Sequence, residues 1–195
     1  MKLSKKDLLP VPYFHLVFTL PEGLRSLALR NQKATYDLLF KAVSETLIKL
    51  AREPKYLGAE IGFITILHTW SQTLLDHPHI HCIVTGGGLS LDGKQWISVR
   101  KDFFLPVKVL SRLFRGKFLD YLKKAYDSGR LVFQGNIAHL KEEPAFKKLL
   151  TDLYHQEWVV YCKPPFKRAE NVIDYLGRYT HRVALSNDRR VKVRR

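Results

Sequence analysis

Two histidines separated by one residue, His79 and His81, are the side chains best placed by their spacing to hold a metal ion. The segment 79–85 (HIHCIVT) is rich in β-branched residues, which predicts a strand. Residues two apart in a strand point to the same face, so the two imidazoles lie side by side and Ile80 faces the other way. Neutral imidazole nitrogens are common metal ligands. The motif alone is equally consistent with packed or surface histidines.

A third histidine, His68, lies near the end of the preceding predicted strand, Ile61 to Trp70. The short polar link between the strands favours an antiparallel pair, which can bring His68 beside His79 and complete a three-histidine set. Gln72 is a further candidate neutral ligand or hydrogen-bond donor, and Asp76 can orient an imidazole through its second nitrogen. Both are weaker candidates than His68.

Two tyrosines, Tyr175 and Tyr179, supply candidate nucleophiles. They are four residues apart on a helix predicted from about Ala169 to Arg182, so their hydroxyls project from one face. A phenol has an ordinary pKa of about 10 and needs a nearby cation or base to attack at neutral pH. Arg178 and Arg182 can provide that cation.

The same helix has a second interpretation. Val172, Tyr175, Leu176 and Tyr179 follow the spacing of an ordinary buried helix face, and taken alone that spacing favours packing over catalysis. The two interpretations are compatible, because a helix that docks this face on the sheet also carries its tyrosines towards the histidines.

The elements that must position these residues alternate between strands and helices. Strands are predicted at Tyr13–Leu20, 61–70, 79–85, 95–100 and 158–162, and helices at 24–51, 106–125, 144–154 and 169–182. Gly86-Gly87-Gly88 is expected to end one strand, and Pro164-Pro165 another. This order predicts an α+β fold with a central antiparallel sheet covered by helices, in preference to a doubly wound parallel sheet.

Charge and cysteine content narrow the function classes. Lys and Arg total 33 against 18 Asp and Glu, a formal charge of +15, which makes nucleic acid the first partner to consider, ahead of a membrane surface or the ribosome. The two cysteines are too few for a zinc finger or a disulfide framework, which fits a reducing cytoplasm. We expect no membrane association, because no apolar run approaches about 20 residues.

Residues 77–88 (HPHIHCIVTGGG) and 175–182 (YLGRYTHR), together with 14–21 (FHLVFTLP) and 68–72 (HTWSQ), resemble a known family. They are similar to the two-tyrosine HUH transposases of the insertion-sequence ninety-one type, which move DNA by a rolling circle. The resemblance covers most of the chain, and the combination of motifs is specific where each motif alone is weak.

The resemblance implies an HUH endonuclease-like fold with a ferredoxin-like or RRM-like palm. It also implies single-strand DNA nicking and strand transfer, with Mg²⁺ or Mn²⁺ on His79 and His81 and with Tyr175 and Tyr179 as nucleophiles. Attack by tyrosine leaves a 5′-phosphotyrosine and a free 3′-hydroxyl. The implied partner is single-stranded DNA at transposon ends and target, and the implied location is the cytoplasm, in association with the nucleoid.

Residues 1–195 are expected to form a single catalytic domain. Members of the family usually carry an upstream cysteine-rich zinc-binding segment and extend beyond the tyrosine helix. We therefore expect this domain to be incomplete at both ends.

DNA contacts are expected from basic residues and from exposed aromatic rings on which bases can stack. The basic candidates are Arg100, Lys101, Lys163, Lys167, Arg168, Arg178 and Arg182, and the aromatic candidates are Trp70, Trp96, Phe103, Phe104 and Trp158. Three alternatives stay open: a noncatalytic single-stranded nucleic-acid-binding domain, an inactive transposase remnant, and a metal-dependent hydrolase that activates water.

Overall fold

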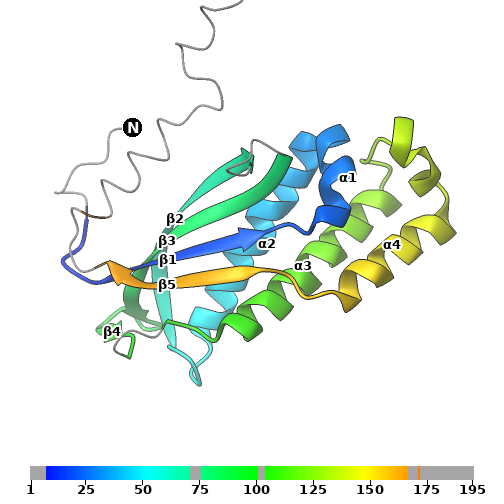
Figure 1. Cartoon of the computed structure of the whole chain (residues 1–195). Coiled ribbons are helices and arrows are strands. Elements are labelled where there is room, and N and C mark those ends of the chain that lie inside the picture. The colour runs from blue at the N-terminus through cyan, green and yellow to red at the C-terminus, as the bar shows by residue number, and fades with distance from the viewer. Residues whose placement is uncertain (1–7, 71–75, 101–103, 167–170, 172–195) are drawn as a thin grey trace, which may run out of the picture.

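A central antiparallel sheet positions the candidate site. The computed structural model describes residues 8–70, 76–100, 104–166 and 171 (Figure 1). Within them the sheet has five strands: β2 (Ala59–Trp70), β3 (Asp76–Ser90), β1 (Tyr13–Thr19) and β5 (Val160–Phe166) lie side by side in that order, and β4 (Trp96–Ser98) pairs with β3. Every pairing is antiparallel, which confirms the α+β class.

The described helices all lie on one face of this sheet (Figure 1), and the opposite face, which none of them covers, is called the open face below. The two long helices are α2 (Gln32–Arg52) and α3 (Val107–Asp127). The shorter elements are η2 (Glu22–Leu24), α1 (Arg25–Arg30), η3 (Gly135–Lys141) and α4 (Glu143–His155). No helix in the described part of the chain is long and apolar enough to cross a membrane.

Alternation along β1 shows how the sheet divides its two faces. Phe14, Leu16 and Phe18 are at most 1% exposed and belong to the main hydrophobic core beneath the helices. Residues between them, such as His15 and Val17, must point to the opposite face because side chains alternate along a strand. The same alternation in β3 puts Ile80 and Cys82 in the core and the histidines on the open face.

The predicted helix 24–51 is divided at Asn31, which separates α1 from α2. The buried Asn31 side chain donates to the carbonyls of Leu27 and Val132 and accepts from the Val132 amide at 2.7 Å. These bonds tie the break to a segment a hundred residues away, so helical periodicity in the sequence did not reveal it.

The prediction that Gly86-Gly87-Gly88 ends a strand is wrong, because β3 continues to Ser90. A Cβ on Gly86 would lie 2.8 Å from the Pro12 carbonyl, and one on Gly88 would collide with the Glu60 carbonyl. The glycines therefore let neighbouring backbone approach closely and allow the irregular register between Ile61 and Phe63 of β2.

The prediction that the last strand ends at Pro164-Pro165 is also wrong, since β5 runs on to Phe166. In the described sheet β5 is an edge strand that pairs only with β1, so a missing amide proton can face away from the ladder. The two prolines also fall where the register shifts between His15 and Tyr13, an irregularity that needs fewer ladder hydrogen bonds.

Two glycine substitutions, which should change the free energy of unfolding in opposite directions, test the close packing around the β3 glycines. Gly88→Ala should lower the free energy of unfolding by about 1–3 kcal/mol, because its methyl group has no room beside Glu60. Gly116→Ala, at an exposed position inside α3 with open space around the new methyl, should raise it by about 0.5–1 kcal/mol. Urea unfolding of both variants is the measurement, and equal effects would contradict the account.

Candidate metal centre

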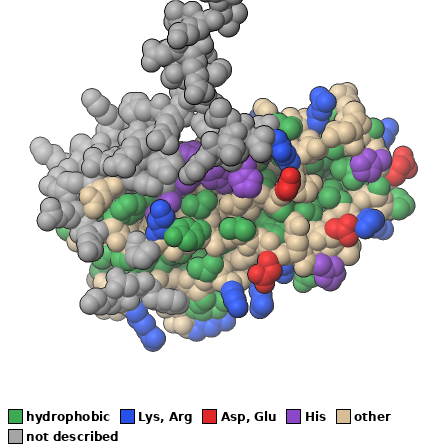
Figure 2. Space-filling view, in the orientation of Figure 1, with side chains coloured by type: hydrophobic (Ala, Val, Ile, Leu, Met, Phe, Trp, Pro, Cys, Tyr) green, Lys and Arg blue, Asp and Glu red, His purple; other side chains and the backbone are tan. Residues whose placement is uncertain are grey.

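Three histidines meet on the open face because two strand registers align them. His68 of β2 pairs directly with His79 of β3, as expected for the antiparallel pair. His81 lies two residues further along β3, where it pairs with Ile66 of β2 on one side and Val17 of β1 on the other. The separate positions 68, 79 and 81 thus become neighbours on one surface, where Figure 2 shows histidine side chains gathered together.

The three imidazoles are close enough to share one ion. One ring nitrogen from each of His68, His79 and His81 lies within 4.8 Å of the other two. Ring centroids are 4.4 Å apart for His68 and His81, 4.9 Å for His79 and His81, and 5.3 Å for His68 and His79. Metal–nitrogen bonds of about 2.0–2.1 Å require donor atoms about 3–4 Å apart, so small side-chain movements suffice.

Hydrogen bonds indicate which ring nitrogen carries the proton in two of the histidines. Nδ1 of His79 lies 2.6 Å from the His77 carbonyl, which can only accept, so Nδ1 carries the proton. The neutral ring then has its lone pair on Nε2. Nδ1 of His81 lies 2.8 Å from Nε2 of His15, and a proton on that Nδ1 would likewise place the lone pair of the His81 ring on its Nε2.

The surroundings keep these rings neutral. The pKa of His81 is lowered to about 3, mainly by burial and to a smaller extent by the neighbouring His68 and His79. Burial also lowers the pKa of His79, and it lowers that of His15 to about 4 together with the charge of Lys163. A metal ligand must be the neutral imidazole, so no proton has to be displaced from these rings at neutral pH.

His15 is the residue that sequence reasoning missed. It is 3% exposed, and its ring stacks on that of His81 with centroids 5.1 Å apart and planes 4° from parallel. A polar residue between Phe14 and Leu16 in an apolar strand was the available signal. Its partner could not be found from the sequence, because the neighbourhood of β1 and β3 is set by the sheet order.

We expect His15 to hold His81 in its metal-binding tautomer. His15→Leu should weaken Mn²⁺ affinity by roughly 10- to 100-fold, the usual effect of losing a partner that orients a metal ligand. His15→Gln, which keeps a polar partner, should lose less. Isothermal titration calorimetry measures both, and affinities within twofold of the wild type for His15→Leu would contradict this role.

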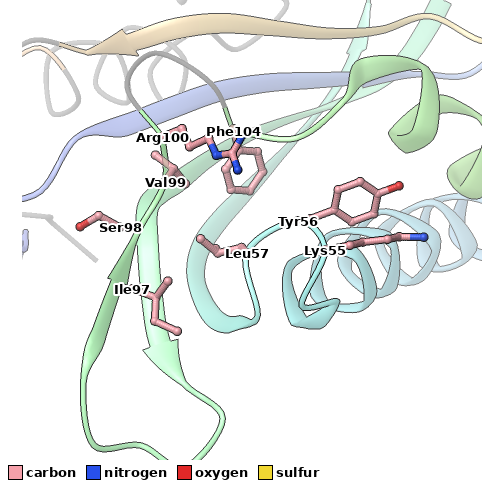
Figure 3. Close-up of a pocket in the computed structure, with 8 residues that line it drawn as sticks. All are labelled: Lys55, Tyr56, Leu57, Ile97, Ser98, Val99, Arg100 and Phe104. Atoms are coloured by element: carbon pink, nitrogen blue, oxygen red, sulfur yellow. The ribbon is translucent and has the colours of Figure 1, made fainter.

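The predicted DNA-contacting residues occupy separate places. Lys163 is exposed and pairs with His15 across β1 and β5, beside the histidines. Arg100 lies well away from them. The amide of the preceding residue, Val99, donates to the Gly86 carbonyl, and Gly86 is five positions from His81 along β3, about 16 Å. Arg100 lines a small pocket between β4 and the turn after α2 (Figure 3), with Lys55, Tyr56, Leu57, Ile97, Ser98, Val99 and Phe104.

The aromatic predictions need correction. Phe104 and Trp158 are 5% and 3% exposed and belong to the hydrophobic core, so neither can stack on a base. Trp158 packs edge-on against Phe114 and donates to the Leu153 carbonyl, which explains its burial. Trp96 is 37% exposed but lies on β4, far from the histidines.

Other expected site residues lie outside the described residues. They are Tyr175, Tyr179, Arg178, Arg182, Lys101, Lys167, Arg168, Gln72 and Phe103. The backbone of Asp76 begins β3 and that of Trp70 ends β2, but the positions of their side chains are also outside the description.

The fold and the site define an α+β protein with a candidate metal centre on the open face of an antiparallel sheet. Residues 62–195 match the family model Y2_Tnp, described as "Putative transposase". The chain therefore belongs to this transposase family.

Two curated relatives are named as transposases. The chain is 54% identical over 189 residues to "Putative transposase y4qJ" of Sinorhizobium fredii, covering 97% of this chain and 48% of that protein. It is 32% identical over 178 residues to "Transposase for insertion sequence element IS801" of Pseudomonas savastanoi pv. phaseolicola, covering 91% of this chain and 41% of that protein. The chain thus spans less than half the length of each.

Solved structures of the conjugative relaxase TrwC with oriT DNA are also similar. The metal-bound complex has 16% sequence identity and a TM-score of 0.46, covering 58% of this chain and 43% of that chain. The metal-free complex has 14% identity and a TM-score of 0.46, covering 90% and 61%.

Proposed function

We propose that this chain is the nicking core of a transposase, which cuts single-stranded DNA and rejoins it through a 5′-phosphotyrosine intermediate. The observation that carries the proposal is the cluster of His68, His79 and His81, whose ring nitrogens converge on the open face of the sheet. Membership of a transposase family supplies the reaction class. The formal charge of +15 suits a polyanionic substrate.

The histidine cluster fits a divalent metal ion. Three neutral imidazoles leave coordination positions open, and phosphate oxygens of DNA can fill them. When bound there, the ion would neutralise charge on the scissile phosphate. Imidazole suits Mn²⁺ better than Mg²⁺, which prefers oxygen ligands, so of the two proposed ions we expect Mn²⁺ to bind more tightly.

The proposed nucleophiles are the phenol oxygens of Tyr175 and Tyr179. One oxygen attacks the phosphorus, its proton passes to a base or to solvent, and a phosphorus–oxygen bond to tyrosine forms. The bond to the 3′-oxygen breaks, and that oxygen leaves as a hydroxyl after taking up a proton. Rejoining reverses these steps on another 3′-hydroxyl, and since one phosphodiester replaces another, no nucleotide cofactor is needed.

The proposal extends to substrate and organisation. We propose that residues 1–195 act as one catalytic domain on single-stranded DNA at transposon ends and target, in the nucleoid of the cytoplasm. Lys163, beside the histidines, and Arg100, at the far end of the sheet, are proposed to contact phosphates there. The remaining expected contacts, Lys101, Lys167, Arg168, Arg178 and Arg182, belong to the same proposal.

Denaturing electrophoresis of a labelled oligonucleotide tests the proposal. The full chain is incubated with single-stranded DNA from a transposon end and Mn²⁺, Mg²⁺ or EDTA. We expect a protein-linked DNA band with either ion, more with Mn²⁺, and none with EDTA or duplex DNA. Cleaved DNA without a linked band would indicate a hydrolase that activates water, and binding without cleavage a noncatalytic domain.

A further inference from the structure

An exposed tyrosine and lysine on β5 continue the open face beyond the histidines. Alternation places Val160 and Cys162 against the core, so Tyr161 and Lys163 point to the open face. Tyr161 is 50% exposed. The Lys163 ammonium lies 6.0 Å from the centre of the Tyr161 ring, so the two side chains form one contiguous surface.

The strand register fixes where this surface lies relative to the histidines. Tyr161 pairs with Val17 of β1, and Val17 pairs with His81 of β3, so the three residues form one row across the sheet. Neighbouring strands are about 4.8 Å apart, which places Tyr161 about 10 Å from His81. That distance is within the span of two nucleotides of extended single strand.

Lys163 also lies next to the histidine cluster. It pairs with His15 across β5 and β1, and the His15 ring stacks on that of His81 with centroids 5.1 Å apart. A phosphate that lies between β5 and the histidines is therefore within reach of the lysine. No carboxylate of the described residues forms an ion pair with Lys163 to compete for that phosphate.

We propose that Tyr161 and Lys163 form a nucleotide subsite, in which an unpaired base stacks on the Tyr161 ring and Lys163 binds the adjoining phosphate. The subsite deepens the proposed function, on which it rests, by assigning the path of the single strand from the histidines across β1 to β5. An aromatic ring gives affinity for any unpaired base, because each base has a stacking face. The subsite selects single strands over duplex, whose bases are already stacked.

Fluorescence anisotropy with a labelled oligonucleotide, without metal, tests the subsite separately from cleavage. Tyr161→Ala should weaken single-strand binding by roughly 5- to 100-fold, whereas Tyr161→Phe, which keeps the ring, should bind within twofold of the wild type. Lys163→Gln should weaken binding and reduce the slope of log affinity against log salt by about 0.7. Thermal unfolding confirms that each variant is folded.

Tyr154→Ala is the matched control, because Tyr154 is 55% exposed but lies on α4. It should bind like the wild type. Equal affinity of Tyr161→Ala and the wild type, or an equal loss in Tyr154→Ala, would overturn the subsite. If the wild-type chain forms no DNA adduct but Tyr161→Ala still binds single strands more weakly, the subsite is supported and the proposed nicking function is rejected.

Photocrosslinking identifies the contact directly. An oligonucleotide that carries 5-iododeoxyuridine should crosslink to Tyr161 in the wild type, and the crosslinked peptide can be identified by mass spectrometry. A crosslink at any other aromatic residue and none at Tyr161 would contradict the assignment.

Discussion

Replacing both Tyr175 and Tyr179 with phenylalanine is expected to abolish the DNA–protein adduct and to slow strand cleavage by at least about a thousandfold. The substitution removes only the two phenol oxygens, and phenylalanine keeps the apolar surface that the helix pattern requires. Binding of single-stranded DNA should stay within about twofold of the wild type. Cleavage is measured by gel under single-turnover conditions, and affinity by anisotropy.

The two single variants test the role of each tyrosine separately. If both tyrosines serve in turn, Tyr175→Phe and Tyr179→Phe should each lose one strand-transfer step, while at least one of them still forms an adduct. Tyr154→Phe is the control, because Tyr154 is exposed on α4. An adduct of normal yield in the double variant would show that the nucleophile is a different residue.

Removing one proposed ligand should have the second large effect. His79→Ala is expected to weaken Mn²⁺ affinity by at least about 100-fold, more than the roughly 10- to 100-fold typical of a residue that only orients a ligand. The two remaining imidazoles, His68 and His81, cannot replace the lost donor atom. Metal-dependent cleavage should fall in parallel, and calorimetry measures the affinity directly.

His77→Ala is a matched control for His79→Ala. Both residues are half-buried and lie two positions apart on β3, but His77 does not belong to the converging group. The His77 carbonyl, which accepts from His79, is retained in the variant. Mn²⁺ affinity should be almost unchanged, and a loss equal to that of His79→Ala would contradict the three-histidine assignment.

Much of the fold was accessible from local pattern. The spacing of His79 and His81 on a strand, and the antiparallel pairing of that strand with the one before it, correctly placed His68 opposite His79. Both inferences need only the two-residue period of a strand and a short connection between neighbours in sequence. Helices α3 and α4 were also found from their apolar spacing.

Features that depend on contacts between residues far apart in the sequence could not be predicted from local sequence patterns. His15 became a neighbour of His81 only because β1 lies between β3 and β5, an order that local sequence does not encode. The prolines of β5 are tolerated because the strand is at the edge of the sheet, and the glycines of β3 because Pro12 and Glu60 approach them. Phe104 and Trp158 were predicted to stack on bases, but both are buried in the core. Local sequence does not reveal this burial, because it depends on the elements that pack around each ring.

Mass spectrometry of the DNA-linked protein tests the central claim most directly. Trypsin separates the two proposed nucleophiles, since Tyr175 lies in the peptide Ala169–Arg178 and Tyr179 in the peptide Tyr179–Arg182. After nuclease digestion, we predict a nucleotide 5′-phosphate on one of these peptides in samples with Mn²⁺ and on neither with EDTA. Cleaved DNA whose 5′-phosphate is free, or is linked to another residue, would contradict the account.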